Sequence, residues 1–117
     1  MSIGTPANSF ANRQLDQVFH ALSDRTRRAL IARLAKRSCM VTELAEPFAM
    51  SLPAVSKHLK VLERAGLVTR TVDGRIHRCA LSPEPLQKAE QWIDRYRPFW
   101  EDTLDALSRY VERGKKP

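Results

Sequence analysis

The stretch Met50–Gly66, MSLPAVSKHLKVLERAG, decides the fold, because it predicts one helix with both of its ends marked. Ser51 is a good N-cap, since its hydroxyl can accept a hydrogen bond from an unpaired amide of the first turn. Pro53 is tolerated in that turn, where backbone amides have no intrahelical partner. Gly66 suits the left-handed position that closes a helix. We therefore predict a helix from about Leu52 to Ala65.

This helix has two different faces. Val55, Leu59 and Leu62 follow steps of four and three, which predicts an apolar stripe facing a core. The opposite face has small residues first and cations further along: Pro53, Ala54, Ser56, Lys57, Lys60 and Arg64. Small side chains allow close approach to base edges, while hydroxyls and cations bind bases and phosphates. For a basic helix taken alone, a solvated surface helix is the plain alternative.

The flanking segments favour nucleic-acid binding. Thr42–Phe48 predicts a short helix that is capped by Thr42 and ends near Pro47, which makes a helix-turn-helix with the helix after Ser51. On the other side, Leu67–Val72 and Arg75–Leu81 alternate like strands around the turn dipeptide Asp73-Gly74. We predict a mainly α fold of about five helices with a small β-hairpin wing, which is a winged helix-turn-helix.

The remaining segments complete the predicted domain organisation. Residues 1–11 predict a flexible arm, and helices are expected from about Asn12 and over about Asp24–Lys36. The DNA-binding core then covers residues 12–82, with Ser38–Val41 as a short strand beside the wing. Residues 83–117 predict a long helix that is kinked or broken near Pro98.

That last helix has an apolar stripe along almost its whole length. A domain of this size cannot bury so much apolar surface alone, so we expect a second copy to cover it; burial within one monomer is the alternative. The expected interface residues, together with the first helix, are Leu15, Val18, Phe19, Leu86, Ile93, Tyr96, Trp100, Leu104, Leu107 and Val111.

The region from Phe19 through Leu81 resembles one family of bacterial regulators. The residues concerned are Ala21–Arg28 (ALSDRTRR), Val41–Ala45 (VTELA), Ala54–Leu62 (AVSKHLKVL) and Glu63–Val68 (ERAGLV). They are similar to the ArsR (ArsR/SmtB) transcriptional repressors. The resemblance implies a homodimeric winged-helix repressor, paired through its last and first helices, whose operator binding is relieved by a signal.

The charge distribution also indicates a nucleic-acid partner. Of the net charge of +7, all lies in residues 1–82, which have 13 Lys/Arg and 6 Asp/Glu, whereas residues 83–117 have seven of each. Such a field steers a protein to a polyanion. No apolar run approaches the ~20 residues that span a bilayer, and no secretion signal is evident. We expect no membrane partner, a cytoplasmic location and reduced cysteines.

The DNA contacts can be assigned by position and by the resemblance. Ser56 and Lys57 are the best candidates for base edges, and Lys60 and Arg64 for phosphates. From the wing, Arg70, Arg75 and His77 would reach the flanking backbone or minor groove. The full predicted set is Ser51, Leu52, Pro53, Ala54, Ser56, Lys57, His58, Lys60, Arg64, Arg70, Arg75 and His77.

Other chemistries find little support. Metal-sensing members of the family place paired cysteines at the start of the third helix, or histidine and carboxylate ligands on the last one. Val41–Ala45 has no cysteine, the last helix has no histidine, and the three histidines have no metal-ligand spacing. No glycine-rich phosphate loop or nucleophile elbow occurs. We predict no metal, no cofactor and no catalytic residues, and leave the effector unassigned.

Two alternatives to a plain repressor stay open. Cys39 and Cys79 become neighbours if the short strand pairs with the outer wing strand, and a disulfide there could switch DNA affinity. The wing could also bind protein, as in an antitoxin or adaptor. The leading prediction is a sequence-specific double-stranded DNA-binding regulator, a homodimeric repressor or autorepressor on an inverted-repeat operator.

Overall fold

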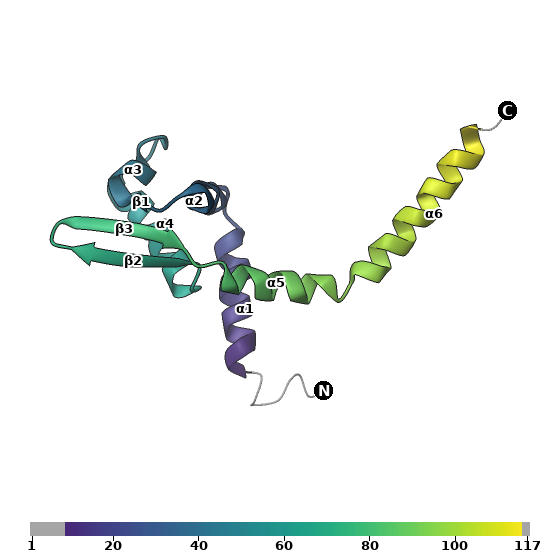
Figure 1. The fold of residues 1–117 in the computed structure, drawn as a ribbon, viewed down its shortest axis with the longest axis horizontal. Coiled ribbons are helices and arrows are strands. Elements are labelled where there is room, and N and C mark those ends of the chain that lie inside the picture. Colours follow the sequence, from purple (N-terminus) through teal and green to yellow (C-terminus); the bar gives the residue numbers. More distant parts are fainter. Residues whose placement is uncertain (1–8, 116–117) are drawn as a thin grey trace.

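The computed structural model describes residues 9–115, and its architecture is a winged helix-turn-helix with a protruding C-terminal helix (Figure 1). The predicted fold class is confirmed, with six helices in the described residues instead of about five. The helices are α1 (Ser9–Leu22), α2 (Arg25–Lys36), α3 (Val41–Ala45), α4 (Leu52–Arg64), α5 (Glu84–Asp94) and α6 (Arg97–Lys115), and the strands are β1 (Cys39–Met40), β2 (Val68–Asp73) and β3 (Ile76–Leu81).

Both ends of α4 form as its sequence predicts. The Ser51 hydroxyl accepts a hydrogen bond of 3.3 Å from the amide of Ala54. At the other end, Gly66 has a φ of 78°. The amides of Gly66 and Leu67 donate back to the carbonyls of Glu63 and Leu62, over 2.9 Å each. This is the Schellman pattern, in which a left-handed residue lets the chain turn back on the helix.

The core forms around the predicted apolar stripe of α4. Val55, Leu59 and Leu62 are fully buried, together with Leu30 of α2 and Leu44 of α3. Complete burial of one such side chain contributes about 1.5–3 kcal/mol relative to an exposed position. The stripe therefore fixes the rotation of α4 about its own axis and turns its polar face outward.

The wing is part of a three-stranded antiparallel sheet of order β1-β3-β2. The register joins Asp73 to Ile76, so Gly74 and Arg75 are the two loop residues, one position later than the Asp73-Gly74 turn that the sequence suggested. Gly74 has a φ of 61°, and no described residue other than glycine has a positive φ. Glycine alone at the first loop position matches a type II′ turn, which suits the twist of a hairpin.

Two helix starts differ from the sequence prediction. α1 begins at Ser9, three residues before Asn12, because no glycine or proline interrupts the chain there; the rest of the predicted arm, residues 1–8, lies outside the described residues. α3 begins at Val41, and its cap is not Thr42. Instead, the Glu43 carboxylate accepts a hydrogen bond of 2.9 Å from the amide of Met40, which satisfies an unpaired donor before the first turn.

The C-terminal tract is broken, not merely kinked. α5 crosses α1 and packs against it, and α6 begins after a two-residue break at Arg95 and Tyr96 and leads away from the body (Figure 1). Pro98 is the second residue of α6, where its missing amide costs no hydrogen bond. Within residues 9–115, no helix combines the length and apolar character that a membrane crossing requires.

Contacts on both sides of this break define its geometry. Trp92 of α5 lies edge-on to Phe19 of α1, with ring centroids 5.6 Å apart, and 5.2 Å from Tyr96. Arg97 forms ion pairs with Asp94 before the break and with Glu101 after it. An aromatic contact therefore joins α5 to the break, and the cation of Arg97 joins α6 to the end of α5.

The close of α4 yields a stability test. Gly66→Ala places a Cβ on a left-handed residue, which costs about 1–2 kcal/mol, and that Cβ would lie 3.4 Å from atoms of Gln14 and Pro85. We expect the free energy of unfolding in urea to fall by this amount. Gly114→Ala is the matched control, because Gly114 lies in open space within a helix. Equal stability of the two variants would contradict the role of Gly66.

Candidate nucleic-acid interface

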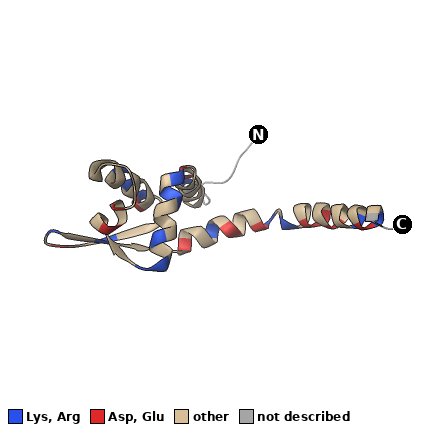
Figure 2. Cartoon of the chain, turned by 90° about the horizontal axis from the view of Figure 1, so that it is seen from above, with Lys and Arg blue, Asp and Glu red and all other residues tan. Residues whose placement is uncertain are grey.

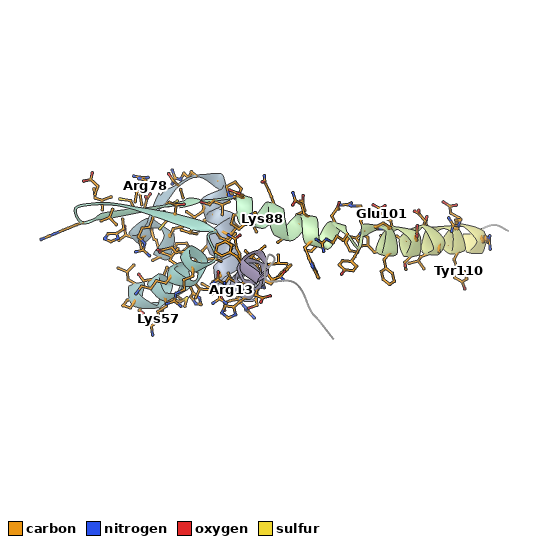
Figure 3. The ribbon with its side chains drawn as sticks, turned by 90° about the horizontal axis from the view of Figure 1, so that it is seen from below. Arg13, Lys57, Arg78, Lys88, Glu101 and Tyr110 are labelled. Carbon is orange, nitrogen blue, oxygen red and sulfur yellow. The ribbon has the colours of Figure 1, made fainter. Side chains whose placement is uncertain are left out.

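The outward face of α4 has the composition that the sequence predicted. Lys57, Lys60 and Arg64 are exposed, as are Ser51, Leu52 and Pro53 at its beginning, while Ala54 and Ser56 are half-buried. Lys57 projects from the outer side of the helix, away from the wing (Figure 3). Because the opposite side of α4 is buried in the core, this exposed face is the one that can enter a duplex groove.

The beginning of α4 and the wing share a second surface. A shallow cavity of about 410 Å³ lies between them. Its lining includes five of the predicted DNA-binding residues: Leu52, Ser56, Arg70, Arg75 and His77. Arg78 follows His77 along β3, so strand alternation turns its side chain to the other face of the wing. Figure 3 shows Arg78 on the side of the wing opposite Lys57. The fold thus brings residues from two separate segments to one surface.

Arg70 has a partner within its own subunit. Its guanidinium donates two hydrogen bonds, of 2.9 and 2.6 Å, to one carboxylate oxygen of Glu63 on α4. It also lies 3.5 Å from Nδ1 of His77 on β3. Only 19% of the Arg70 side chain is exposed. Arg70 therefore connects α4 to the wing, and its predicted contact with phosphate would have to compete with Glu63.

His58 also faces inward, toward α2. Its Nδ1 lies 3.2 Å from a guanidinium nitrogen of Arg27 and 3.8 Å from the Asp24 carboxylate. Because a guanidinium offers only donors, Nδ1 acts as the acceptor, and the neutral ring has its proton on Nε2. This position suits a residue that orients α4 better than one that contacts DNA.

Arg27 is a functional candidate that the sequence pattern did not reveal. It is the one charged residue among the buried side chains of the described chain, with 9% exposed. Its guanidinium donates to the carbonyls of Ala21 and His20, over 2.8 and 3.0 Å, at the end of α1. A cation is favourable there, because unpaired carbonyls give a helix C-terminus partial negative charge. Arg27 thus joins α1, α2 and α4.

Asp24 is the N-cap of α2. Its carboxylate accepts a hydrogen bond of 3.0 Å from the backbone amide of Arg27. That hydrogen bond keeps the pKa of Asp24 below its ordinary value, and the neighbouring His58 and Arg27 side chains lower it further. The ionised carboxylate is therefore the form that caps the helix.

The structure divides the predicted interface residues into two groups. Val18 belongs to the subunit's own core with 1% exposure, so its prediction as an interface residue is wrong: the step pattern of α1 marks a face packed inside the subunit. Leu15, Phe19 and Leu86 are partly buried against the same core. The exposed group lies beyond them and consists of Ile93, Tyr96, Leu104, Leu107 and Val111, with Trp100 partly exposed.

The two cysteines are neighbours in the sheet, as the strand argument predicted. β1 pairs with β3, and Cys39 lies opposite Cys79 in the register. Both thiols are free and buried. Burial raises the pKa of the Cys79 thiol, and this disfavours the reactive thiolate. The register therefore places the two cysteines opposite each other, and burial of Cys79 opposes formation of its thiolate.

The geometry described above defines a winged helix-turn-helix transcriptional regulator, and comparisons with known proteins identify its family. A model of the helix-turn-helix domain matches residues 22–71. HTH-type transcriptional regulator Rv2034 of Mycobacterium tuberculosis is 38% identical over 100 residues, which are 86% of this chain and 91% of that protein. Transcriptional repressor SdpR of Bacillus subtilis is 30% identical over 79 residues, 68% of this chain and 88% of the repressor.

A solved structure extends the comparison to three dimensions. The crystal structure of the ArsR family transcriptional regulator RHA00566 superposes with a TM-score of 0.72 at 40% identity, covering 77% of this chain and 93% of the other. The chain belongs to the ArsR family of winged helix-turn-helix transcriptional regulators. Its helix-turn-helix is a DNA-binding fold, and the family consists of regulators and not enzymes.

The contact between Arg27 and His58 leads to a matched pair of variants. His58→Ala removes the acceptor of a buried cation's N–H, and a donor left without a partner costs about 1–3 kcal/mol. His58→Asn keeps an acceptor close to the position of Nδ1 and should recover most of that loss. Denaturant unfolding measures both free energies. If Asn destabilises as much as Ala, the hydrogen bond to Arg27 is not what positions His58.

Proposed function

We propose that this regulator is a homodimeric repressor that binds an inverted-repeat operator. The two copies of α4 enter successive major grooves, about 34 Å apart, and the wings contact the flanking backbone. Repression follows from occupation of promoter DNA. In this proposal, residues 12–82 read the DNA and residues 83–117 join the two copies.

The observation that supports this proposal best is the shared surface of α4 and the wing. Leu52 and Ser56 from the helix border the same cavity as Arg75 and His77 from the hairpin. Lys57, Lys60 and Arg64 are exposed on the outer side of the same helix. Hydroxyl and cationic groups of this kind bind base edges and phosphates. Lysine at position 57 suits the acceptor atoms of guanine.

Charge and apolar surface support the same arrangement. Basic residues occur through the body and at the wing tip, whereas acidic and basic residues mix along α5 and α6 (Figure 2). The exposed apolar side chains of α6 need a cover, and a second copy provides one while doubling the reading surface. The relative SdpR is named a transcriptional repressor, which favours repression over activation.

A double substitution tests the reading surface. Lys57→Ala with Arg75→Ala removes one base contact and one backbone contact, so we expect operator affinity to fall by about a hundredfold. The operator is first located by footprinting the promoter upstream of the chain's own gene, and affinity is then measured by gel shift at fixed salt. The log–log dependence on salt should become shallower by about one for Arg75→Ala alone.

The control for this experiment is Arg78→Ala, on the other side of the wing strand, which should bind DNA like the unchanged protein. Sedimentation of the double variant should still give a dimer. If the double variant keeps its operator affinity but loses a protein partner, the wing serves protein recognition, as in an antitoxin or adaptor. Equal affinity for operator and bulk DNA would reduce the protein to a nonspecific binder.

The thiol pair calls for a second measurement. The pairing of Cys39 with Cys79 favours a disulfide, but burial and the raised pKa of the Cys79 thiol oppose one. We expect diamide-treated and reduced protein to bind operator with affinities within about twofold of each other, since a thiol is a poor nucleophile. A tenfold loss on oxidation that Cys79→Ser abolishes would instead establish a redox-responsive repressor.

A further inference from the structure

Helix α2 is strongly basic, and its exposed cations lie at its two ends. Residues 25–42 have six cations and no acid. Two of these cations are buried or half-buried within the subunit. The four exposed cations form one pair in the first turn and one pair at the C-terminal end: Arg25 with Arg28, and Lys36 with Arg37. At 1.5 Å per residue, the centres of the two pairs are about 15 Å apart along the helix axis.

The two ends of α2 lie on opposite sides of the molecule. At its start, the Arg27 guanidinium lies 3.2 Å from Nδ1 of His58 on α4, and His58 follows Lys57 in the chain. At its end, two residues lead into β1, whose register with β3 reaches Arg78. Figure 3 shows Lys57 and Arg78 on opposite sides. The first turn of α2 is therefore on the side where α4 exposes Lys57, and its last turn is on the other side.

The first turn is an unfavourable position for two exposed cations. A helix N-terminus has partial positive charge, which cations oppose, and the first turn of α2 has no acid. Arg28 gains a compensating contact, because its guanidinium donates a hydrogen bond of 2.7 Å to the carbonyl of Leu22 at the end of α1. Arg25 is exposed, and no hydrogen bond or ion pair within residues 9–115 includes its side chain. Folding of the subunit therefore gives no reason for a cation at position 25.

The neighbouring carboxylate does not neutralise this cation. Asp24 accepts a hydrogen bond of 3.0 Å from the backbone amide of Arg27 and lies 3.8 Å from Nδ1 of His58. The negative charge of Asp24 is thus used in the contact between α2 and α4. Arg25 keeps its charge for a partner outside the subunit.

We propose that Arg25 binds a backbone phosphate of the operator, beside the major groove that α4 enters. The inference rests on the proposed function and adds a third segment of the chain to the DNA interface. A helix in the major groove lies between two phosphate backbones, so an exposed cation beside α4 on the same side of the molecule is placed to contact one of them. A guanidinium suits this contact, since its N–H groups match pairs of phosphate oxygens. Arg28 strengthens the positive field at the same end of α2.

Two charge reversals test this contact, and the helix dipole gives them opposite effects on folding. R25E places an acid at the start of α2, which favours the helix, whereas K36E places an acid at its end, which disfavours the helix. Both variants have the same net charge. We expect R25E to bind the operator about tenfold more weakly, with a urea midpoint equal to or above that of the unchanged protein. K36E should lower the midpoint and keep the operator affinity within about twofold, since its position is remote from the DNA.

The salt dependence identifies the contact as one with phosphate. R25A should reduce the slope of log affinity against log salt by about one, because one contact fewer releases counterions from the duplex. The loss of affinity should be the same for the operator and for an unrelated duplex of equal length, since phosphates carry no sequence information. K36A is the matched control and should leave the slope unchanged. Gel shifts over a series of salt concentrations measure both variants on both duplexes.

Equal weakening by R25E and K36E would overturn the inference, because net charge alone would then account for the loss. Unchanged affinity of R25E would overturn it as well. If the unchanged protein binds the operator no better than the unrelated duplex, the proposed repressor fails, but the two variants compared on that duplex still decide the phosphate contact. A specific operator complex that R25E leaves intact rejects the contact and leaves the repressor.

Discussion

The burial of one stripe on α4 is the constraint on which the rest of the structure depends. Val55, Leu59 and Leu62 have no exposed surface, so the helix cannot rotate without exposing apolar side chains at a cost of a few kcal/mol. Its polar side is thereby fixed outward. Helices α1, α2 and α3 provide the surface that receives the stripe, and the wing continues directly from the end of α4.

Polar contacts then fix the position of α4 along its own axis, which apolar burial leaves free. A hydrophobic stripe sets the rotation of a helix, but it permits small shifts along the axis because it has no directional bonds. Arg27 adds directional hydrogen bonds, since its guanidinium joins the carbonyls at the end of α1 to His58. Arg70 does the same on the other side by joining Glu63 to the wing. Two buried or half-buried cations thus position α4 between the body and the hairpin.

Local signals made much of this fold predictable. The caps of α4, the two wing strands and the pairing of Cys39 with Cys79 depend on residues whose spacing or backbone preference is visible in the chain. The structure differs from the sequence prediction where the deciding interaction joins residues that are distant in the chain. Val18 was predicted to face a second copy, but its own subunit covers it. The position of Arg27 depends on carbonyls six and seven residues earlier and on a ring 31 residues later. The DNA contacts themselves stay predictions.

The two-residue joint at Arg95 and Tyr96 gives α6 the properties of a lever. The helix is about 28 Å long at 1.5 Å per residue, so a rotation of 10° at the joint moves its far end by about 5 Å. In a dimer connected through the α6 helices, the same rotation alters the separation of the two DNA-reading surfaces. Changes in the rings and ion pairs around the joint could thus retune the accepted half-site spacing, with every residue that meets the bases left as it is.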